Sequence, residues 1–291
     1  MSLWQHLSNQ ISQQTQVDFQ ILSHQALSGG CINQAYKISD ADRHYFLKLN
    51  DYKHGDMFKA EALSLNEINA SNVIRAPEVV CYGAFDSQTY LVMEYLTLTG
   101  RVNSATLGHQ LAAMHKITSA HFGWYMDNTI GSTPQYNQTT DNWVEFWRNQ
   151  RLLPQLELAK HNGYASALTP LTDRLLANFH HLFSNHKPAP SLLHGDLWGG
   201  NAAALADGTP VIFDPALYYG DREADIAMTH LFGGFEREFY AAYNDVWPLD
   251  DGFAVRKTFY NLYHIINHLN LFGSGYLGQA ISMTEQVLSE I

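Results

Sequence analysis

The stretch His194-Gly195-Asp196-Leu197-Trp198-Gly199-Gly200-Asn201 is followed shortly by Val211-Ile212-Phe213-Asp214. An aspartate, an asparagine five residues later and a second aspartate after a short hydrophobic strand are typical of the acidic side of a kinase site for phosphoryl transfer. We expect Asp196 to accept the proton of the attacking hydroxyl, and Asn201 and Asp214 to supply oxygen ligands for the Mg²⁺ on ATP. The alternative is a Gly-rich loop between two short strands, with solvated acids.

One residue of this loop separates the chain from protein kinases, which carry His-Arg-Asp at the corresponding place. Here Gly195 stands where the arginine would be. That arginine usually reads a phosphorylated activation loop. Its absence therefore favours a kinase for small molecules.

The composition suits a soluble enzyme. A chain of 291 residues, 46% hydrophobic and 15% charged, is long enough to bury a substantial core and is not typical of a disordered protein. The net charge of -11 opposes a nucleic-acid or anionic-membrane partner. No apolar run approaches the roughly 20 residues of a membrane span, and residues 1–20 are too polar for a signal peptide. Two cysteines are too few for a disulfide scaffold, so the reducing cytoplasm is the expected location.

The order of predicted elements is that of an α+β, two-lobed, protein-kinase-like fold. The N-lobe is expected over residues 1–95 and the larger, mainly helical C-lobe over 96–291, with a hinge at 94–99. Strands are expected at 19–27, 33–39, 45–49, 79–83 and 89–93, with a helix around 58–68. In the C-lobe, helices are expected at 107–115, 143–158, 168–183 and 256–271, and an ordered loop at 123–140.

The N-lobe offers candidates for each part of a nucleotide site. Gly29 and Gly30 would let backbone amides approach the phosphates, although two glycines between strands are more often a hairpin turn. Lys48 lies late in the third strand, where it could bridge the α- and β-phosphates or simply face solvent. Glu61 shares the apolar face of the following helix, and a carboxylate on an inward face needs a cation. We therefore predict a Lys48–Glu61 ion pair.

The adenine is expected at the start of the hinge. Met93 would close the back of the adenine pocket, and the backbone groups of Glu94 and Leu96, on either side of Tyr95, would read the base edge. In isolation the same residues are equally consistent with the end of a structural strand.

The chain resembles the fructosamine kinase (ketosamine 3-kinase) family, which is related to the aminoglycoside and choline phosphotransferases. The resemblance covers almost the whole chain, and its most specific parts are Trp198 in the catalytic loop and the run from Tyr219 to Asp225. Other matching segments are 29–33, 214–216, 231–235 and 263–273.

The resemblance implies ATP-dependent phosphorylation of the 3-hydroxyl of a ketosamine, the sugar adduct that glycation leaves on an amine, free or in a protein. Bacterial-type members favour ribulosamine and erythrulosamine over fructosamine. The rival interpretations are a phosphotransferase for an aminoglycoside, choline or an amino sugar, and a non-catalytic nucleotide-binding scaffold.

Four residues are candidates for substrate contact. Trp198 would stack on the sugar or pack the loop, and His268 would reach substrate or remain a core histidine. Asp221 or Glu223 would meet the substrate amine or form a solvated helix start. Asp225 is expected to brace the catalytic loop through backbone amides.

The cysteines carry the last expectation. Cys31 lies in the predicted phosphate loop, where nearby amides can lower a thiol pKa, so it is a redox candidate. The chain is expected to be a monomer, and the alternative is a disulfide-linked dimer through Cys31. For Cys31 itself, the alternative to a redox role is a small loop side chain with no role. Cys81 is expected to be buried and inert. No zinc-type spacing accompanies the fifteen histidines.

Overall fold

The computed structural model describes residues 1–27, 33–51 and 55–291, which form two compact units. One unit contains Met1–Asn103 and Ala203–Pro215, and the other contains Ser104–Ala202 and Ala216–Ile291. The first unit therefore continues past the predicted boundary at residue 95, and it also includes the later segment Ala203–Pro215. The reason is backbone pairing, because Arg75 bridges to Val211 and the Gly100 N–H donates to the carbonyl of Ala204.

The first unit is built on a five-stranded antiparallel sheet in the order β1-β2-β3-β5-β4. Its strands are β1 (Ser23–Leu27), β2 (Gln34–Ser39), β3 (His44–Asp51), β4 (Val79–Phe85) and β5 (Gln88–Glu94). Its helices are α1 (Leu3–Thr15) and α2 (Gly55–Ala70), and the returning segment carries β9 (Ala202–Ala204) and β10 (Pro210–Ile212).

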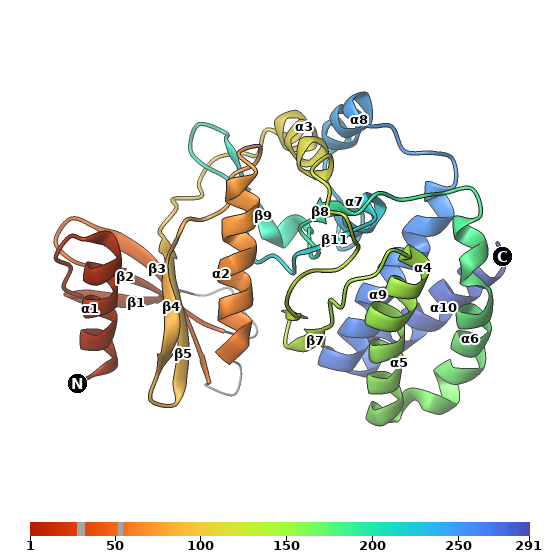
Figure 1. The fold of residues 1–291 in the computed structure, drawn as a ribbon, viewed down its shortest axis with the longest axis horizontal. Helices are drawn as coiled ribbons and strands as arrows, with labels where there is room; N and C mark the ends of the chain where they lie inside the picture. Colours follow the sequence, from red (N-terminus) through yellow and green to blue (C-terminus); the bar gives the residue numbers. More distant parts are fainter. Residues whose placement is uncertain (28–32, 52–54) are drawn as a thin grey trace. The chain divides into compact units, whose positions relative to one another are not determined.

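The two helices cover opposite faces of this sheet (Figure 1). Leu7 and Ile11 of α1 form a core cluster with Leu47 and Leu49 of β3, while α2 packs on β4 and β5. Because successive side chains of a strand point to opposite faces, the residue between Leu47 and Leu49 must face α2. That residue is Lys48.

The second unit is mainly helical, as predicted. Its longer helices are α3 (Ser104–His115), α5 (Leu153–Ala159), α6 (Ala165–Asn178), α7 (Arg222–Thr229), α8 (Arg237–Val246), α9 (Phe253–Phe272) and α10 (Leu277–Leu288). Short strands pair as β6 (Asn128–Ile130) with β7 (Thr133–Gln135), and as β8 (Ser191–Leu193) with β11 (Tyr218–Gly220). The expected loop at 123–140 therefore contains a hairpin.

The helix predicted at 143–158 is broken in the structure. It consists of α4 (Trp143–Phe146), a π-helix over Trp147–Leu152 and then α5, with a second π-helix over Lys160–Tyr164. Pro154 lies in the first turn of α5 and has no N–H for a helical hydrogen bond, so the helix restarts there. Similarly, the helix predicted at 168–183 is α6 followed by the 3₁₀ turn Phe179–Phe183.

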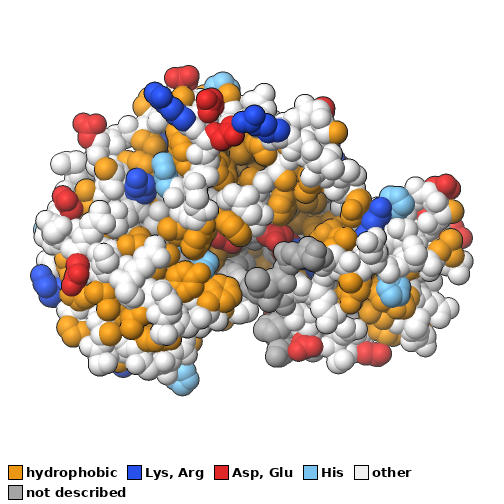
Figure 2. All heavy atoms as spheres, turned by 180° about the vertical axis from the view of Figure 1, so that it is seen from behind, with side chains coloured by type: hydrophobic (Ala, Val, Ile, Leu, Met, Phe, Trp, Pro, Cys, Tyr) orange, Lys and Arg blue, Asp and Glu red, His pale blue; other side chains and the backbone are white. Residues whose placement is uncertain are grey.

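The surface is mixed in character. On the face shown in Figure 2, Lys and Arg side chains are scattered, and several lie beside acidic side chains. Within the described ranges, none of the helices has the length and apolar character needed to cross a membrane.

Candidate active site

The predicted ion pair between Lys48 and Glu61 is present. Lys48 Nζ lies 2.6 Å from Glu61 Oε1, and only 7% of Lys48 is exposed. Strand alternation directs the lysine to the α2 face, and the helical period places Glu61 next to Phe58 and Ala62 on the inward face of α2. The lysine is therefore held from two elements rather than facing solvent.

Asp214 approaches the same ammonium. Lys48 Nζ lies 2.5 Å from Asp214 Oδ1, and 48% of the Asp214 side chain remains exposed. The backbone of Asp214 has φ 58°, a left-handed conformation that is uncommon outside glycine and that often occurs at functional sites. The residue follows β10, whose Ile212 N–H donates to the carbonyl of Arg75. A half-exposed carboxylate thus stands beside a buried lysine.

The charges of this cluster depend on one another. Burial by itself would lower the pKa of Lys48, but the carboxylates of Asp214 and Glu61 outweigh it and hold that pKa above its usual range. Burial raises the pKa of Glu61, and the attraction of Lys48 opposes this shift only in part. Lys48 consequently stays cationic at neutral pH.

The hinge residues show a mixed picture. Met93 is buried, but the N–H of Glu94 donates to the Glu78 carbonyl, and its carboxylate pairs with Arg75 at 2.9 Å. The Glu94 N–H is therefore already used within the unit. Tyr95 receives Lys37 over its ring at 4.5 Å, and Leu96 follows it without regular secondary structure.

Some predicted residues cannot be placed. Gly29, Gly30 and Cys31 lie outside the described residues, so the phosphate-loop and redox predictions stay predictions. Cys81 is half-buried rather than fully buried, and burial raises the pKa of its thiol to about 12. A thiol that stays protonated is a poor nucleophile, which fits the inert role expected for Cys81.

In the second unit, the loop that begins at His194 brings Asp196 and Asn201 together. A 3₁₀ turn over Gly199–Asn201 folds the asparagine back, and its Nδ2 donates to the Asp196 carbonyl at 2.8 Å and to Asp196 Oδ2 at 3.3 Å. Asp196 is partly exposed, whereas Asn201 is buried. The five-residue spacing thus places the predicted base in hydrogen-bond contact with one predicted metal ligand.

Asp225, at the buried start of α7, holds this loop in place. Its carboxylate accepts hydrogen bonds from the backbone N–H groups of His194 at 2.6 Å and Gly195 at 2.8 Å, as the sequence predicted. His115 Nε2 lies 3.2 Å from the same carboxylate, and His115 Nδ1 lies 2.8 Å from Tyr243 Oη. Burial by itself would raise the pKa of Asp225, but the hydrogen bonds from His115 and the backbone lower it.

His115 and Tyr243 were not recognised from the sequence as part of the site. His115 ends a predicted helix and Tyr243 lies on α8, far along the chain. A histidine among the apolar positions of the helix at 107–115 was the available signal, since a buried polar side chain needs a partner.

Asp221 and Glu223 are buried at the start of α7, and their oxygens are engaged within the unit. Asp221 Oδ2 accepts from Tyr260 at 2.6 Å and lies 2.7 Å from His186 Nε2. Glu223 receives Arg256 at 2.6 and 3.0 Å. This arrangement ties α7 to α9 and gives no support to the expected contact with a substrate amine.

The carboxylates near His186 could suggest a cation site. Ligand atoms of His186, Glu223 and Asp250 lie within 4.8 Å of one another. However, Arg256 pairs with Glu223 and also with Asp250 at 2.5 Å. The guanidinium already supplies the positive charge, so we assign no metal there.

Trp198 and His268 belong to one aromatic group in this unit. Trp198 is half-buried, and a Cβ added at Gly200 would lie 2.3 Å from its indole, so the ring rests directly on that glycine. His268 is half-buried on α9, where its Nδ1 lies 2.8 Å from the His264 carbonyl. Both are accessible in part, as contact with a substrate would require.

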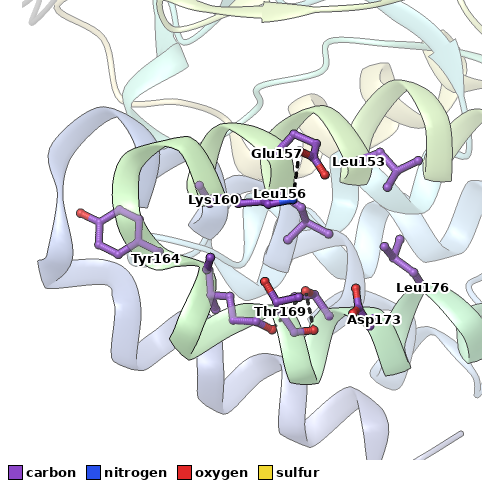
Figure 3. A pocket seen from close by; sticks show the side chains of 12 residues that line it. Leu153, Leu156, Glu157, Lys160, Tyr164, Thr169, Asp173 and Leu176 are labelled. Carbon is purple, nitrogen blue, oxygen red and sulfur yellow. Dashed lines mark hydrogen bonds and ion pairs between the residues drawn. The ribbon is translucent and has the colours of Figure 1, made fainter.

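A pocket of about 220 Å³ lies elsewhere in the second unit, between α5, the π-helix after it and α6 (Figure 3). Leu153, Leu156, Tyr164 and Leu176 contribute to its wall, with the Glu157–Lys160 ion pair at its edge. None of the predicted site residues lines it, so we do not assign it to the reaction.

Comparison with known proteins decides the family. The model of the fructosamine kinase family matches residues 3–290. A probable ketoamine kinase of Synechocystis sp. is 46% identical over 98% of this chain and 97% of that protein. The chain belongs to the fructosamine kinase family. A chloroplastic protein-ribulosamine 3-kinase of Arabidopsis thaliana is 42% identical over 92% of this chain and 83% of the plant protein.

Solved structures agree on the fold. A candidate fructosamine-3-kinase from Haemophilus somnus superposes with a TM-score of 0.91 at 28% identity, covering 99% of this chain and 100% of that one. A spectinomycin phosphotransferase superposes at 0.56 with 16% identity, over 98% of this chain and 93% of that one, which is a likeness of fold alone. The expected family and the two-lobed kinase-like fold, with a β-rich first part and a helical second part, are confirmed.

Proposed function

We propose that this fructosamine kinase family member transfers the γ-phosphoryl group of ATP to the 3-hydroxyl of a ketosamine, with ribulosamine and erythrulosamine as the preferred sugars. The observation that carries the proposal is the Lys48–Glu61–Asp214 cluster, together with the Asp196–Asn201 pair, in a chain of this family. Phosphoryl transfer needs mainly positioning and charge neutralisation, and these five residues supply both.

Each residue has a distinct proposed role. Asp196 accepts the proton of the substrate hydroxyl, since its carboxylate is partly exposed and the Asn201 amide fixes its orientation. Lys48 contacts the α- and β-phosphates, and Glu61 keeps the ammonium in position. Because Lys48 also contacts Asp214, the nucleotide phosphates compete for one ammonium with a carboxylate.

The donor set fits a magnesium ion. Asn201 and Asp214 offer amide and carboxylate oxygens, the hard ligands that Mg²⁺ prefers, and half of the Asp214 side chain is exposed. When bound, the ion neutralises charge on the β- and γ-phosphates. Asn201 donates through Nδ2 to Asp196, so its Oδ1 is the atom proposed as the ligand.

Other residues of the first unit are proposed to contact the nucleotide. Gly29 and Gly30 are proposed to hold the phosphates through their backbone, with Met93, Tyr95, Leu96 and the backbone carbonyl of Glu94 around the adenine. The Glu94 N–H is left out of this proposal because it already serves Glu78. The substrate is a free or protein-bound ketosamine.

The test is turnover of ATP against ribulosyl-, erythrulosyl- and fructosyl-lysine side by side, with choline and an aminoglycoside as rival acceptors. Phosphorus NMR of the product identifies the hydroxyl that receives the phosphoryl group. We expect a 3-phosphate on the ribulosyl and erythrulosyl adducts. Phosphorylation of only choline or the aminoglycoside would favour the rival phosphotransferase, and ATP binding without any turnover would favour the nucleotide-binding scaffold.

A further inference from the structure

A row of aromatic rings extends from the catalytic loop across the second unit. The ring centroids of Trp198 and Phe232 are 6.0 Å apart, and those of Phe232 and His268 are 4.7 Å apart. His268 in turn lies 5.3 Å from Phe272 and 5.2 Å from Tyr276. We call these five side chains the aromatic shelf.

The shelf is partly open to solvent. Phe232 is 40% exposed and Phe272 is 53% exposed, although phenylalanine is a residue that folding usually buries. Single exposed apolar residues need no explanation, but here two of them meet around one histidine. The rings therefore offer faces and edges that the second unit itself does not fully cover.

Local backbone geometry presents these rings. Phe232 has φ 54°, and Gly233 and Gly234 follow with φ 107° and 75°. A bulky residue in the left-handed region is uncommon and persists only where the surroundings enforce it. At the end of α9, Gly273 has φ 91°, and the chain turns into a short 3₁₀ helix that returns Tyr276 to His268.

The chemistry of a ketosamine matches this surface. The amine is attached at carbon 1, so only carbons 1 and 2 separate it from the carbon that carries the reacting hydroxyl. Trp198 lies two positions after Asp196, which we propose as the base. A group that holds the amine must therefore lie close to the catalytic loop, where the shelf begins.

We infer that the aromatic shelf binds the amine-bearing part of the ketosamine and selects amines that carry an apolar or aromatic skeleton. The substrate ammonium is a cation, and aromatic faces attract cations. The carbon skeleton beyond it packs on the exposed rings of Phe232 and Phe272. This inference rests on the proposed function.

His268 is the centre of the shelf and is suited to a cationic neighbour. The His264 carbonyl can only accept, so Nδ1 is the donor, and Nε2 is the acceptor nitrogen when the ring is neutral. Burial lowers the pKa of His268, although the hydrogen bond to His264 opposes this shift. A neutral imidazole adds an aromatic surface and a hydrogen-bond acceptor without repelling the ammonium.

The experiment compares two substrates with the same sugar, ribulosyl-phenylalanine and ribulosyl-glycine. Affinity is measured by titration calorimetry, independently of turnover. The wild type should bind ribulosyl-phenylalanine about 3- to 10-fold more tightly, the usual strength of an aromatic pair. Phe272→Ala and Tyr276→Ala should each remove most of this preference while leaving ATP affinity unchanged. Tyr125→Ala is the matched control, because Tyr125 is a 67% exposed aromatic residue of the same unit outside the shelf.

The possible outcomes separate the shelf from the proposed function. Equal affinity for both substrates in the wild type, or a full preference in both shelf variants, would overturn the shelf even if both substrates are phosphorylated. A preference that the shelf variants lose, without phosphorylation of either substrate, would support the shelf and overturn the kinase activity on ketosamines. Thermal unfolding of each variant shows whether a lost preference reflects lost folding.

Discussion

The carboxylate of Asp225 accepts a hydrogen bond from the backbone N–H of Gly195 at 2.8 Å, so α7 fixes the peptide that precedes the proposed catalytic base. The N–H of His194 donates to the same carboxylate at 2.6 Å. One buried side chain thus sets the direction in which Asp196 leaves the loop.

Replacing this carboxylate should loosen the loop and the fold together. In Asp225→Asn, an amide NH₂ group would face backbone N–H donors, and buried donors would be left unpaired. We expect the free energy of unfolding to fall by about 3 kcal/mol, and turnover to fall more than ATP affinity. Denaturant unfolding and steady-state kinetics measure the two effects. Asp173→Asn, an exposed aspartate of the same unit, should change neither, and a fully stable Asp225→Asn would contradict the bracing role.

The proposed base can be tested without disturbing the nucleotide. Asp196→Asn keeps the shape and the contact with Asn201 but cannot accept the proton. Turnover should fall by about 10²- to 10⁴-fold, the usual contribution of a positioned general base. ATP affinity, measured by calorimetry, should stay within error of the wild type. Turnover close to that of the wild type would remove Asp196 from the mechanism.

Loss of the Asp214 carboxylate should weaken binding of the magnesium ion more than binding of the adenine. Asp214→Ala is expected to abolish turnover and to weaken Mg-ATP far more than metal-free ATP, because the lost carboxylate serves the ion. The measurement is binding of ATP with and without magnesium. Asp86→Ala provides a matched control, since Asp86 is an exposed aspartate of the same unit that also has a positive φ, 51°. If both forms of ATP lose affinity equally, the metal-ligand role is wrong.

His264 should make the fold sensitive to acid. Burial, with a smaller effect of His268, lowers the pKa of His264 to about 3. In the unfolded chain the pKa of this histidine is roughly 6.5. Stability from this group is complete above the unfolded pKa. It is lost as pH falls below that value, because only the unfolded state takes up the proton. Between about pH 6 and pH 4 the loss approaches about 1.4 kcal/mol per pH unit.

Unfolding measured across this range tests the effect. His264→Leu should show a slope shallower by the contribution of one proton, whatever its stability at neutral pH. Leu269→Ala, a buried substitution on the same helix, should lower stability by a similar amount at each pH and keep the wild-type slope. An unchanged slope in His264→Leu would show that other groups cause the acid sensitivity.

Local sequence patterns were sufficient for a large part of the proposed site. The contact between Asp196 and Asn201 depends only on a short loop. The pairing of Lys48 with Glu61 depends on one strand and one helix, whose side-chain periods can be read directly from the sequence. Other features depend on partners far apart in the chain. Asp221 was expected to meet the substrate amine or to lie at a solvated helix start. It is buried instead, because Tyr260 and His186 reach it from α9 and from the segment before β8.

Local sequence patterns could not predict the irregular helices either, because the contacts that hold them come from distant parts of the chain. The fully buried Arg151 lies in the π-helix after α4, where its guanidinium stacks on the Tyr218 ring at 4.0 Å and donates to Asn137 at 2.7 Å. Neither partner is close in sequence. Helix α1 was missed because its buried stripe is narrow, with Leu7 and Ile11 as its buried apolar residues in an otherwise polar segment.

Gly195 limits how this enzyme could be controlled. Its φ is 83°, and an ideal Cβ there would lie 2.0 Å from the carbonyl oxygen of Ala216. The arginine that protein kinases place at this point could therefore not be acquired by a single substitution, since the turn at Ala216 would first have to be rebuilt. An on-switch that depends on an arginine at this position would require the same rebuilding of the turn, so we expect position 195 to stay glycine wherever the turn at Ala216 is kept.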